Sequence, residues 1–211
     1  MIHEIFPCLY LVRTAGPSAK TPYTYLLRRP AGNILLATKA DMADDWDALM
    51  ALGRVSHILL GDRHHVGAAS AGLSAKLEVP LSATKAEAVA ARQKDLQITD
   101  ILRDERYHLA DDLEVIPTPG HTNGAVSYLW SNGGRRFLFI GDTLVPIDGR
   151  WEFWVTRPNR PLMSQTIDML RGIEFDVILS NSFACTPDAW FELTTEDRAA
   201  LFQSVTTALL G

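Results

Sequence analysis

Histidine and carboxylate side chains follow several apolar runs of the sequence, at points where strand ends can bring them together. They are Asp62, His64 and His65 after SHILL (56–60), His121 within TPGHT (118–122), and Asp142 after RRFLFIG (135–141). The proline and glycine of TPGHT predict a sharp turn that projects its histidine at the end of a sheet. Two imidazoles with one or two carboxylates suit Zn²⁺ or an open Fe²⁺ or Mn²⁺ site, so ligand type alone does not select the metal.

Short apolar runs predict the strands that position these residues. β-Branched or aromatic stretches bounded by turn residues are typical of strands, and Pro30, Gly32 and Asn33 between two of them indicate a hairpin. The expected strands include TPYTYLLRRP (21–30), NILLAT (33–38), SHILL (56–60), runs around ERYHL (105–109) and LEVIPT (113–118), AVSYLW (125–130), RRFLFIG (135–141) and DVILS (176–180).

Capping residues and apolar periodicity predict the helices. Asp41 is expected to cap a helix over 41–52 that Gly53 ends, and small residues over 61–75 indicate a tight loop that opens into a closely packed helix. Further helices are predicted after a Thr84/Glu87 capping box, over 160–172, and from a Thr194/Asp197 cap to Leu210. Strands followed by helices, twice over, predict two mixed sheets with helices outside, in one domain spanning 1–211.

The composition excludes several classes of protein. The 211 residues carry 20 Lys+Arg against 25 Asp+Glu, a formal net charge of −5, and 47% hydrophobic residues with 21% charged ones exclude a disordered chain. Basic residues form only isolated doublets such as Arg28-Arg29, so a nucleic-acid partner is disfavoured. We expect a small-molecule substrate or ligand as the partner.

The two cysteines and the first residues bear on the compartment. Cys8 and Cys185 are far apart and indicate neither a disulfide framework nor a thiolate metal site. The start MIHEIFPCLYLVR lacks the features of a secretory signal, and no window approaches the roughly 20 apolar residues of a membrane helix. The sequence therefore predicts a cytoplasmic protein without a membrane partner.

The stretch TPGHTNGAVSYLW followed by FLFIGDTL resembles the metallo-β-lactamase superfamily. The resemblance implies a four-layer αββα sandwich of the α/β class, in which His121 binds metal and Asp142 bridges two metals. It extends to the order of the elements: TPYTYLL resembles the entry hairpin of the family, SHILLGDRHH stands where the HxHxDH ligand loop is expected, and DVILSNSFA stands where a late histidine usually follows a strand.

Three ligand-bearing segments depart from the family pattern. Laid without gaps on HxHxDH, residues 62–67 place Asp62 and His64 in the first two ligand positions and Val66-Gly67 where the Asp-His pair of the second metal would stand. Residues 180–182 are Ser-Asn-Ser, without the late histidine, and Ala37 stands where the hairpin strand often carries Asp. A shift of the alignment would instead bring in His65.

The surviving ligands all fit the first metal position and the bridging carboxylate. The resemblance therefore implies at most one divalent metal, with zinc as the first choice and iron or manganese as alternatives, or no metal at all. The candidate ligands are Asp62, His64, His65, His121 and Asp142, and the candidate catalytic residues are His64 and Asp142.

Each candidate also has a purely structural interpretation. Asp62 is equally suited to cap the helix expected after Val66, and His121 without a metal would hydrogen-bond Asp142. Asp142 itself is compatible with a simple turn. The aromatic residues Trp151, Phe153 and Trp154 suit a substrate wall or a dimer contact, although a strand in the core is the preferred interpretation.

The remaining charged and imidazole side chains receive ordinary roles. Arg157 and Arg160 could meet an anionic substrate but need no such explanation on a solvated loop. His3, His57 and His108 are assigned to packing or to the surface.

The first functional hypothesis is a metal-dependent hydrolase of a small ester or thioester. A bound metal would lower the pKa of a water toward about 7 and supply the nucleophile. The rival is a non-catalytic, metal-free protein of the same fold that binds a metabolite or a partner chain, and a homodimer is compatible with both. Redox chemistry at a single iron has only the two histidines and a carboxylate in its favour.

Overall fold

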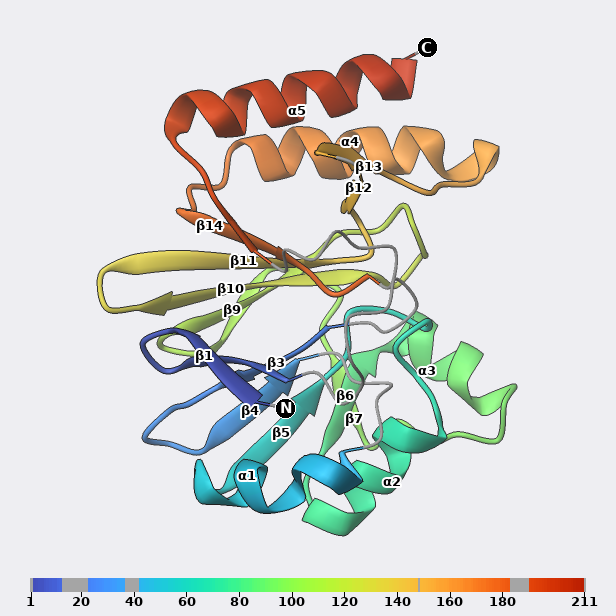
Figure 1. Ribbon diagram of the computed structural model, residues 1–211. Helices are drawn as coiled ribbons and strands as arrows, with labels where there is room; N and C mark the ends of the chain where they lie inside the picture. The colour runs from blue at the N-terminus through green and yellow to red at the C-terminus, as the bar shows by residue number, and fades with distance from the viewer. Residues whose placement is uncertain (1, 13–22, 37–41, 148, 183–189, 211) are drawn as a thin grey trace.

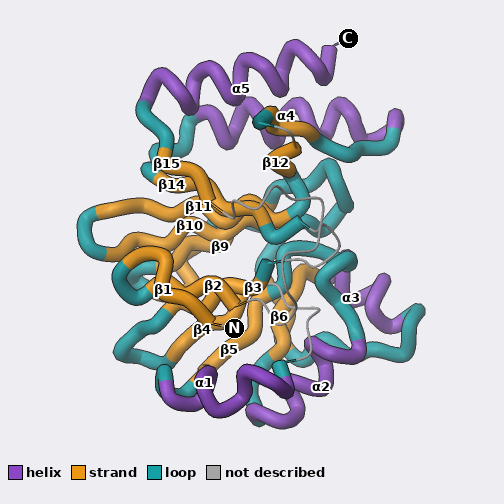
Figure 2. The backbone as a smooth tube through the Cα atoms, viewed as in Figure 1, coloured by secondary structure: helices purple, strands orange, loops and turns teal. Residues whose placement is uncertain are grey.

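The structure is a computed structural model that describes residues 2–12, 23–36, 42–147, 149–182 and 190–210. Three residues used above, Ala37, Asp41 and Cys185, lie outside these ranges. Two mixed β-sheets face each other, and helices cover the outer face of each sheet (Figures 1 and 2). The expected αββα sandwich is therefore confirmed.

The first sheet has its seven strands in sequence order. They are β1 (Ile2–Phe6), β2 (Leu9–Val12), β3 (Thr24–Leu27), β4 (Asn33–Leu36), β5 (Val55–Leu59), β6 (Leu81–Thr84) and β7 (Asp100–Leu102). Pairing is antiparallel from β1 to β4 and parallel from β4 to β7. The parallel strands are linked by helices that lie on the outer face: η1 (Ala43–Asp45), α1 (Trp46–Ala51), α2 (Ala68–Leu77) and α3 (Lys85–Arg92).

The second sheet has the strand order β15-β14-β11-β10-β9-β8. Its strands are β8 (Tyr107–Ala110), β9 (Leu113–Pro117), β10 (Val126–Asn132), β11 (Arg135–Gly141), β14 (Val177–Ser180) and β15 (Trp190–Glu192). Only β11 and β14 pair in parallel. The short hairpin of β12 (Val145–Ile147) and β13 (Arg150–Glu152), then η2 (Arg157–Asn159) and α4 (Arg160–Arg171), connect those two strands, and α5 (Thr195–Leu210) follows β15.

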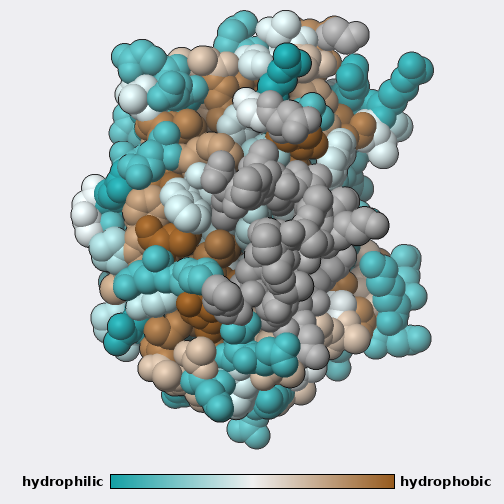
Figure 3. All heavy atoms as spheres, viewed as in Figure 1, coloured by the Kyte–Doolittle hydropathy of each residue, from teal (hydrophilic) through white to brown (hydrophobic). Residues whose placement is uncertain are grey.

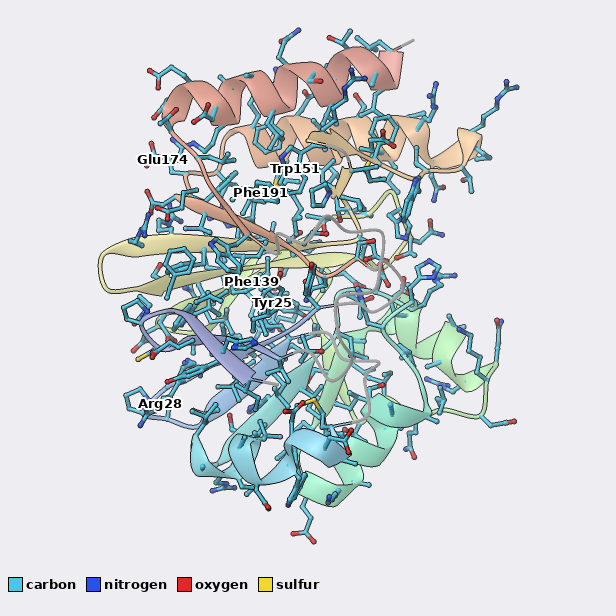
Figure 4. All side chains as sticks on the ribbon, in the orientation of Figure 1. Tyr25, Arg28, Phe139, Trp151, Glu174 and Phe191 are labelled. Atoms are coloured by element: carbon cyan, nitrogen blue, oxygen red, sulfur yellow. The ribbon has the colours of Figure 1, made fainter. Side chains whose placement is uncertain are left out.

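Three hydrophobic clusters separate the four layers. One lies between the sheets, where the rings of Tyr25 and Phe139 contact each other with centroids 5.3 Å apart (Figure 4). The second packs the first sheet on α1–α3, and the third packs the second sheet on α4 and α5. Alternation along β3 explains the division, because Tyr25 and Leu27 face the middle cluster while Leu26 faces the helices.

Most predicted elements are confirmed within a few residues, including β11, α4 and α5. The predicted cap of α5 is present: the backbone N–H of Asp197 donates to Thr194 Oγ1 (3.1 Å) and that of Thr194 donates to Asp197 Oδ2 (3.0 Å). The Thr84/Glu87 capping box is wrong. Thr84 is the N-cap of α3 without a side-chain cap bond, because both side chains make tertiary hydrogen bonds instead.

The aromatic stretch after Asp142 contributes to the core, as preferred above. Trp151 lies in β13, and its ring meets that of Phe191 edge to face with centroids 5.2 Å apart (Figure 4). Both side chains, with Phe153, pack on the third cluster.

The surface shown in Figure 3 has hydrophilic and hydrophobic residues interspersed. Among the described helices, none combines the length and the apolar character needed to cross a membrane.

Candidate metal centre

The loop after β5 exposes one of two adjacent histidines and buries the other. Asp62 Oδ1 accepts a hydrogen bond from the backbone N–H of His64 at 2.7 Å, which closes a tight turn of the kind that Asp favours. The side chain of His64 is consequently exposed, whereas His65 is only 2% exposed. The N-cap of α2 is Gly67, so Asp62 does not cap that helix.

The loop after β9 carries His121 and is held by its neighbours. Gly120, with φ +149°, lies so close to α4 that a Cβ there would be 2.9 Å from the Cα of Met163. The hydroxyl of Thr166 donates to the carbonyl of Pro119 at 2.5 Å, and Asn159 Nδ2 donates to the carbonyl of Gly120 at 3.1 Å. Helix α4 and the end of η2 thus fix the turn that presents His121.

Asp142 leaves the end of β11 through a glycine in the left-handed region, Gly141, with φ +59°. Gly61 likewise precedes Asp62, shortly after the end of β5, but without a positive φ. The two glycines face each other across the sheets: a Cβ built on Gly61 would lie 3.7 Å from the Cα of Gly141. Their lack of side chains allows the two strand ends to approach and brings the two carboxylates together.

Asp62, His121 and Asp142 form one compact group of potential metal ligands. Their ligand atoms all lie within 4.8 Å of one another. His121 Nε2 is 3.8 Å from Asp62 Oδ2 and 3.9 Å from Asp142 Oδ2. All three side chains are largely buried. The metal-free interpretation in which His121 hydrogen-bonds Asp142 is wrong here, because 3.9 Å exceeds hydrogen-bond distance.

The orientation of His121 depends on a backbone group that the sequence did not indicate. Its Nδ1 lies 2.7 Å from the carbonyl oxygen of Trp154, which leaves Nε2 directed at the carboxylates. A hydrogen bond that fixes one imidazole nitrogen is the usual support of a metal-binding histidine. No residue type marks such a carbonyl, so the sequence carries no signal for it.

His65 lies between the carboxylates of Asp62 and Asp142. Its Nδ1 is 3.4 Å from Asp62 Oδ1, and its Nε2 is 3.4 Å from Asp142 Oδ1. His64 is exposed, and its ring centroid lies 4.9 Å from that of His121. Neither belongs to the compact ligand group of the described residues, although both were considered ligands in the sequence.

The electrostatic setting lowers the pKa of one carboxyl group, Asp142, and of one imidazole, His64. Burial by itself would raise the pKa of Asp142, but the imidazoles of His65, His121 and His64 outweigh this and lower that pKa below its ordinary value. The pKa of His64 is lowered, chiefly by desolvation, although the Asp62 carboxylate opposes the shift. His64 is therefore neutral at pH 7.

A cavity of about 360 Å³ opens beside His121. Among the described residues, its lining includes His64, Arg63, Thr122, Asn123 and Asn159. A substrate in this cavity would meet polar side chains. The aromatic stretch 151–154 is not part of the described lining of this cavity.

The positions expected to hold the second metal contain no histidine or carboxylate among the described residues. Val66 is buried in the cluster under α2, and Gly67 caps that helix. Asn181 uses its Nδ2 to donate to the carbonyl of Tyr23 at 3.2 Å, and Ser182 is buried beside it. Ala37 lies outside the described residues.

The compact group fits a divalent cation. Among the described residues, Asp62 Oδ2 and His121 Nε2 lie 3.8 Å apart, are buried and have no hydrogen-bond partner. Asp142 Oδ2 lies 3.9 Å from the same His121 nitrogen, whereas Asp142 Oδ1 faces His65 at 3.4 Å. Buried polar atoms are normally paired, since an unpaired one costs about 1–3 kcal/mol. One imidazole nitrogen and two carboxylate oxygens are suitable ligands for zinc, iron or manganese.

No family model and no curated protein matches the sequence. Solved structures do match. A metallo-β-lactamase from Cronobacter sakazakii with a HARLDQ motif has a TM-score of 0.66 at 22% identity, covering 85% of this chain and 80% of that one. A metallo-β-lactamase from Pontibacter korlensis has a TM-score of 0.75 at 14% identity over 100% and 99% of the two chains. The metallo-β-lactamase GOB-18 from Elizabethkingia meningoseptica has a TM-score of 0.69 at 16% identity over 99% and 90%.

Proposed function

We propose that this protein, whose chain has the metallo-β-lactamase fold, binds one divalent metal and hydrolyses a small ester or thioester. The observation that carries the proposal is the compact group of Asp62, His121 and Asp142, in which Asp62 Oδ2 and His121 Nε2 lie 3.8 Å apart, are buried and have no hydrogen-bond partner among the described residues. Zinc is the metal that we propose first, with iron or manganese as alternatives.

Each residue of the site would have a distinct role. Asp62, His121 and Asp142 would hold the ion, and a divalent ion held there supplies Lewis acidity that polarises a carbonyl and activates water near neutral pH. His64 lines the cavity as an exposed, neutral imidazole, so it is placed to accept a proton from a nucleophile or pass one to a leaving group. Asn123 and Asn159 line the same cavity and offer amide groups that orient a substrate.

The contents of the second metal position support a single ion. Val66 and Gly67 offer no ligand side chain, and Asn181 and Ser182 stand where a histidine would bind the second metal. We therefore propose at most one tightly bound metal per chain. Elemental analysis of protein purified without chelator tests this, with one equivalent or less expected, and two stoichiometric equivalents would contradict it.

Activity is tested with an aryl acetate and an acyl thioester, each assayed on metal-free protein and on protein reloaded with one equivalent of zinc. We expect hydrolysis only in the reloaded sample, and a similar loss on replacing His121 by Ala. Wild-type protein that binds zinc but hydrolyses neither compound would contradict the hydrolase part of the proposal.

One observation favours a second candidate, a metal-free protein that binds a metabolite or partner. His65 bridges the two carboxylates at 3.4 Å to each, so when protonated it can neutralise part of their charge in place of a metal. The two candidates differ in the effect of His121→Ala: loss of bound metal supports the first, whereas a changed stability without any metal in the wild type supports the second.

A further inference from the structure

Glu87 of α3 is hydrogen-bonded to both loops that carry Asp62 and His121, although it belongs to neither. Its Oε2 accepts from Arg63 Nε at 2.8 Å, and its Oε1 lies 3.2 Å from Arg63 Nη2. Oε1 also accepts from the backbone N–H of Gly124 at 2.9 Å. Arg63 is next to Asp62 in the chain, and Gly124 is in the loop of His121.

Because the Glu87 carboxylate is buried, the folded state needs these hydrogen bonds to offset the cost of burying its charge. Glu87 is 0% exposed, whereas the side chain of its partner Arg63 is 36% exposed. A buried carboxylate is strongly destabilising unless it is paired and hydrogen-bonded. Among the described residues, every hydrogen bond to this carboxylate comes from the two loops. The loops can therefore leave their places only by stranding a buried charge.

The loop of His121 is docked on α3 closely enough to exclude a side chain. Thr84 Oγ1 donates to the carbonyl of Gly124 at 2.8 Å, so both backbone groups of this glycine are bonded to α3 and its N-cap. A Cβ on Gly124 would lie 2.3 Å from Thr84 Oγ1 and 2.7 Å from Glu87 Oε1. The glycine permits the docking, and the docking uses the two residues that would otherwise have formed the capping box of α3.

We propose that Glu87 is a positioning residue of the candidate metal centre, which holds the Asp62 loop through Arg63 and the His121 loop through Gly124 at one carboxylate. The inference rests on the proposed function where it concerns zinc affinity. The ordering of the two loops does not depend on a metal. Glu87 itself is not a ligand, because its carboxylate oxygens are bonded to Arg63 and Gly124.

The test compares Glu87→Ala and Glu87→Gln with Glu114→Gln. Glu114 is a matched control, since it pairs with Arg106 (2.7 Å) away from the site. Hydrogen exchange of metal-free protein reports the order of the loops 61–67 and 118–125, and competition with a chelating indicator gives the zinc affinity. Glu87→Gln covers the case in which Glu87→Ala does not fold, because the Gln side chain keeps an acceptor for Gly124 but turns an amide toward Arg63.

We expect Glu87→Ala to raise exchange in both loops by about tenfold or more while the β10–β11 hairpin stays protected. Zinc affinity should fall by about tenfold or more, within the roughly 10–100-fold range of residues that orient metal ligands. Glu87→Gln should loosen the 61–67 loop more than the 118–125 loop, and Glu114→Gln should change neither. If the Glu87 variants fold and both loops exchange at the wild-type rate, the inference is wrong. If the wild-type protein binds no zinc, the proposed function is wrong, and the exchange measurement alone then decides whether Glu87 positions the loops.

Discussion

Nε2 of His121 lies 3.8 Å from Oδ2 of Asp62, although the two residues follow strands of different sheets. The backbone brings them together: the N–H of Val126 donates to the carbonyl of Gly61 at 2.8 Å, and the hydroxyl of Tyr128 donates to the carbonyl of Leu60 at 2.7 Å. Strand β10 of the second sheet is thereby bonded to the end of β5 in the first. The candidate site lies where the two sheets converge.

Replacing Asp62 by Asn should abolish tight metal binding without unfolding the protein. The Asn side chain keeps an acceptor for the His64 N–H but removes the negative charge from a ligand. Zinc affinity measured by chelator competition should fall more than about a hundredfold, beyond the effect of residues that only orient ligands. His108→Ala, at an exposed histidine of β8, is the control. Unchanged affinity of Asp62→Asn would remove Asp62 from the ligand set.

Zinc should raise the midpoint of thermal unfolding in a concentration-dependent way. An ion that binds only the folded chain stabilises it by about 2.7 kcal/mol when its free concentration is a hundred times Kd. Differential scanning calorimetry with and without EDTA measures this shift, and the shift should disappear in His121→Ala. An equal shift in that variant would indicate that the ion binds elsewhere.

The Arg29–Asp112 pair should make stability fall in acid. Burial by itself would raise the pKa of Asp112, but hydrogen bonds from Arg29 and Trp130 outweigh it and lower the pKa below 3.8. A depressed pKa stabilises the folded state above the unfolded value and loses that contribution as pH falls through the folded one. Asp112→Asn should therefore cost about 1 kcal/mol at pH 7, a figure reduced for partial exposure, and a smaller amount at pH 2.

Urea unfolding of Asp112→Asn at both pH values, with the exposed neighbour Asp111→Asn as control, checks the Asp112 prediction. A cost of the same size at pH 2 and pH 7 would show that the Asp112 side chain acts through packing and not through its charge.

Two glycine substitutions should change the free energy of unfolding in opposite directions. Gly124→Ala places a Cβ 2.3 Å from Thr84 Oγ1 and should destabilise by about 1–3 kcal/mol, the usual cost of overpacking. Gly72→Ala, within α2, meets no atom within 4 Å and should stabilise by roughly 0.5–1 kcal/mol, because alanine favours a helix. Chemical denaturation of both variants measures the two free energies. A neutral Gly124→Ala would contradict the close docking on α3.

Local signals made much of the fold predictable, and tertiary contacts explain where prediction failed. The cap of α5 was correct because Thr194 and Asp197 bond to each other within one turn. Glu87 stands in an equivalent pattern, but its carboxylate binds Gly124, 37 residues away. Nothing in the local sequence distinguishes the two cases.

The candidate site was predictable in its residues but not in their geometry. Asp62, His121 and Asp142 all stand at strand ends that the sequence marks with glycine or proline. Which of His64 and His65 faces the carboxylates depends on the hydrogen bond from the His64 N–H to Asp62, and the orientation of His121 depends on the carbonyl of Trp154. These contacts involve backbone groups, which every residue type carries, so the sequence does not indicate them.

The order of the strands gives the site a further property. Among the described residues, the first sheet consists of strands from the first half of the chain and the second sheet of strands from the second half, and the described backbone passes from one sheet to the other between Leu102 and Tyr107. Asp62 comes from one half, and His121 and Asp142 come from the other. Neither half contains all three proposed ligands, so an ion that binds them would strengthen the association of the two halves.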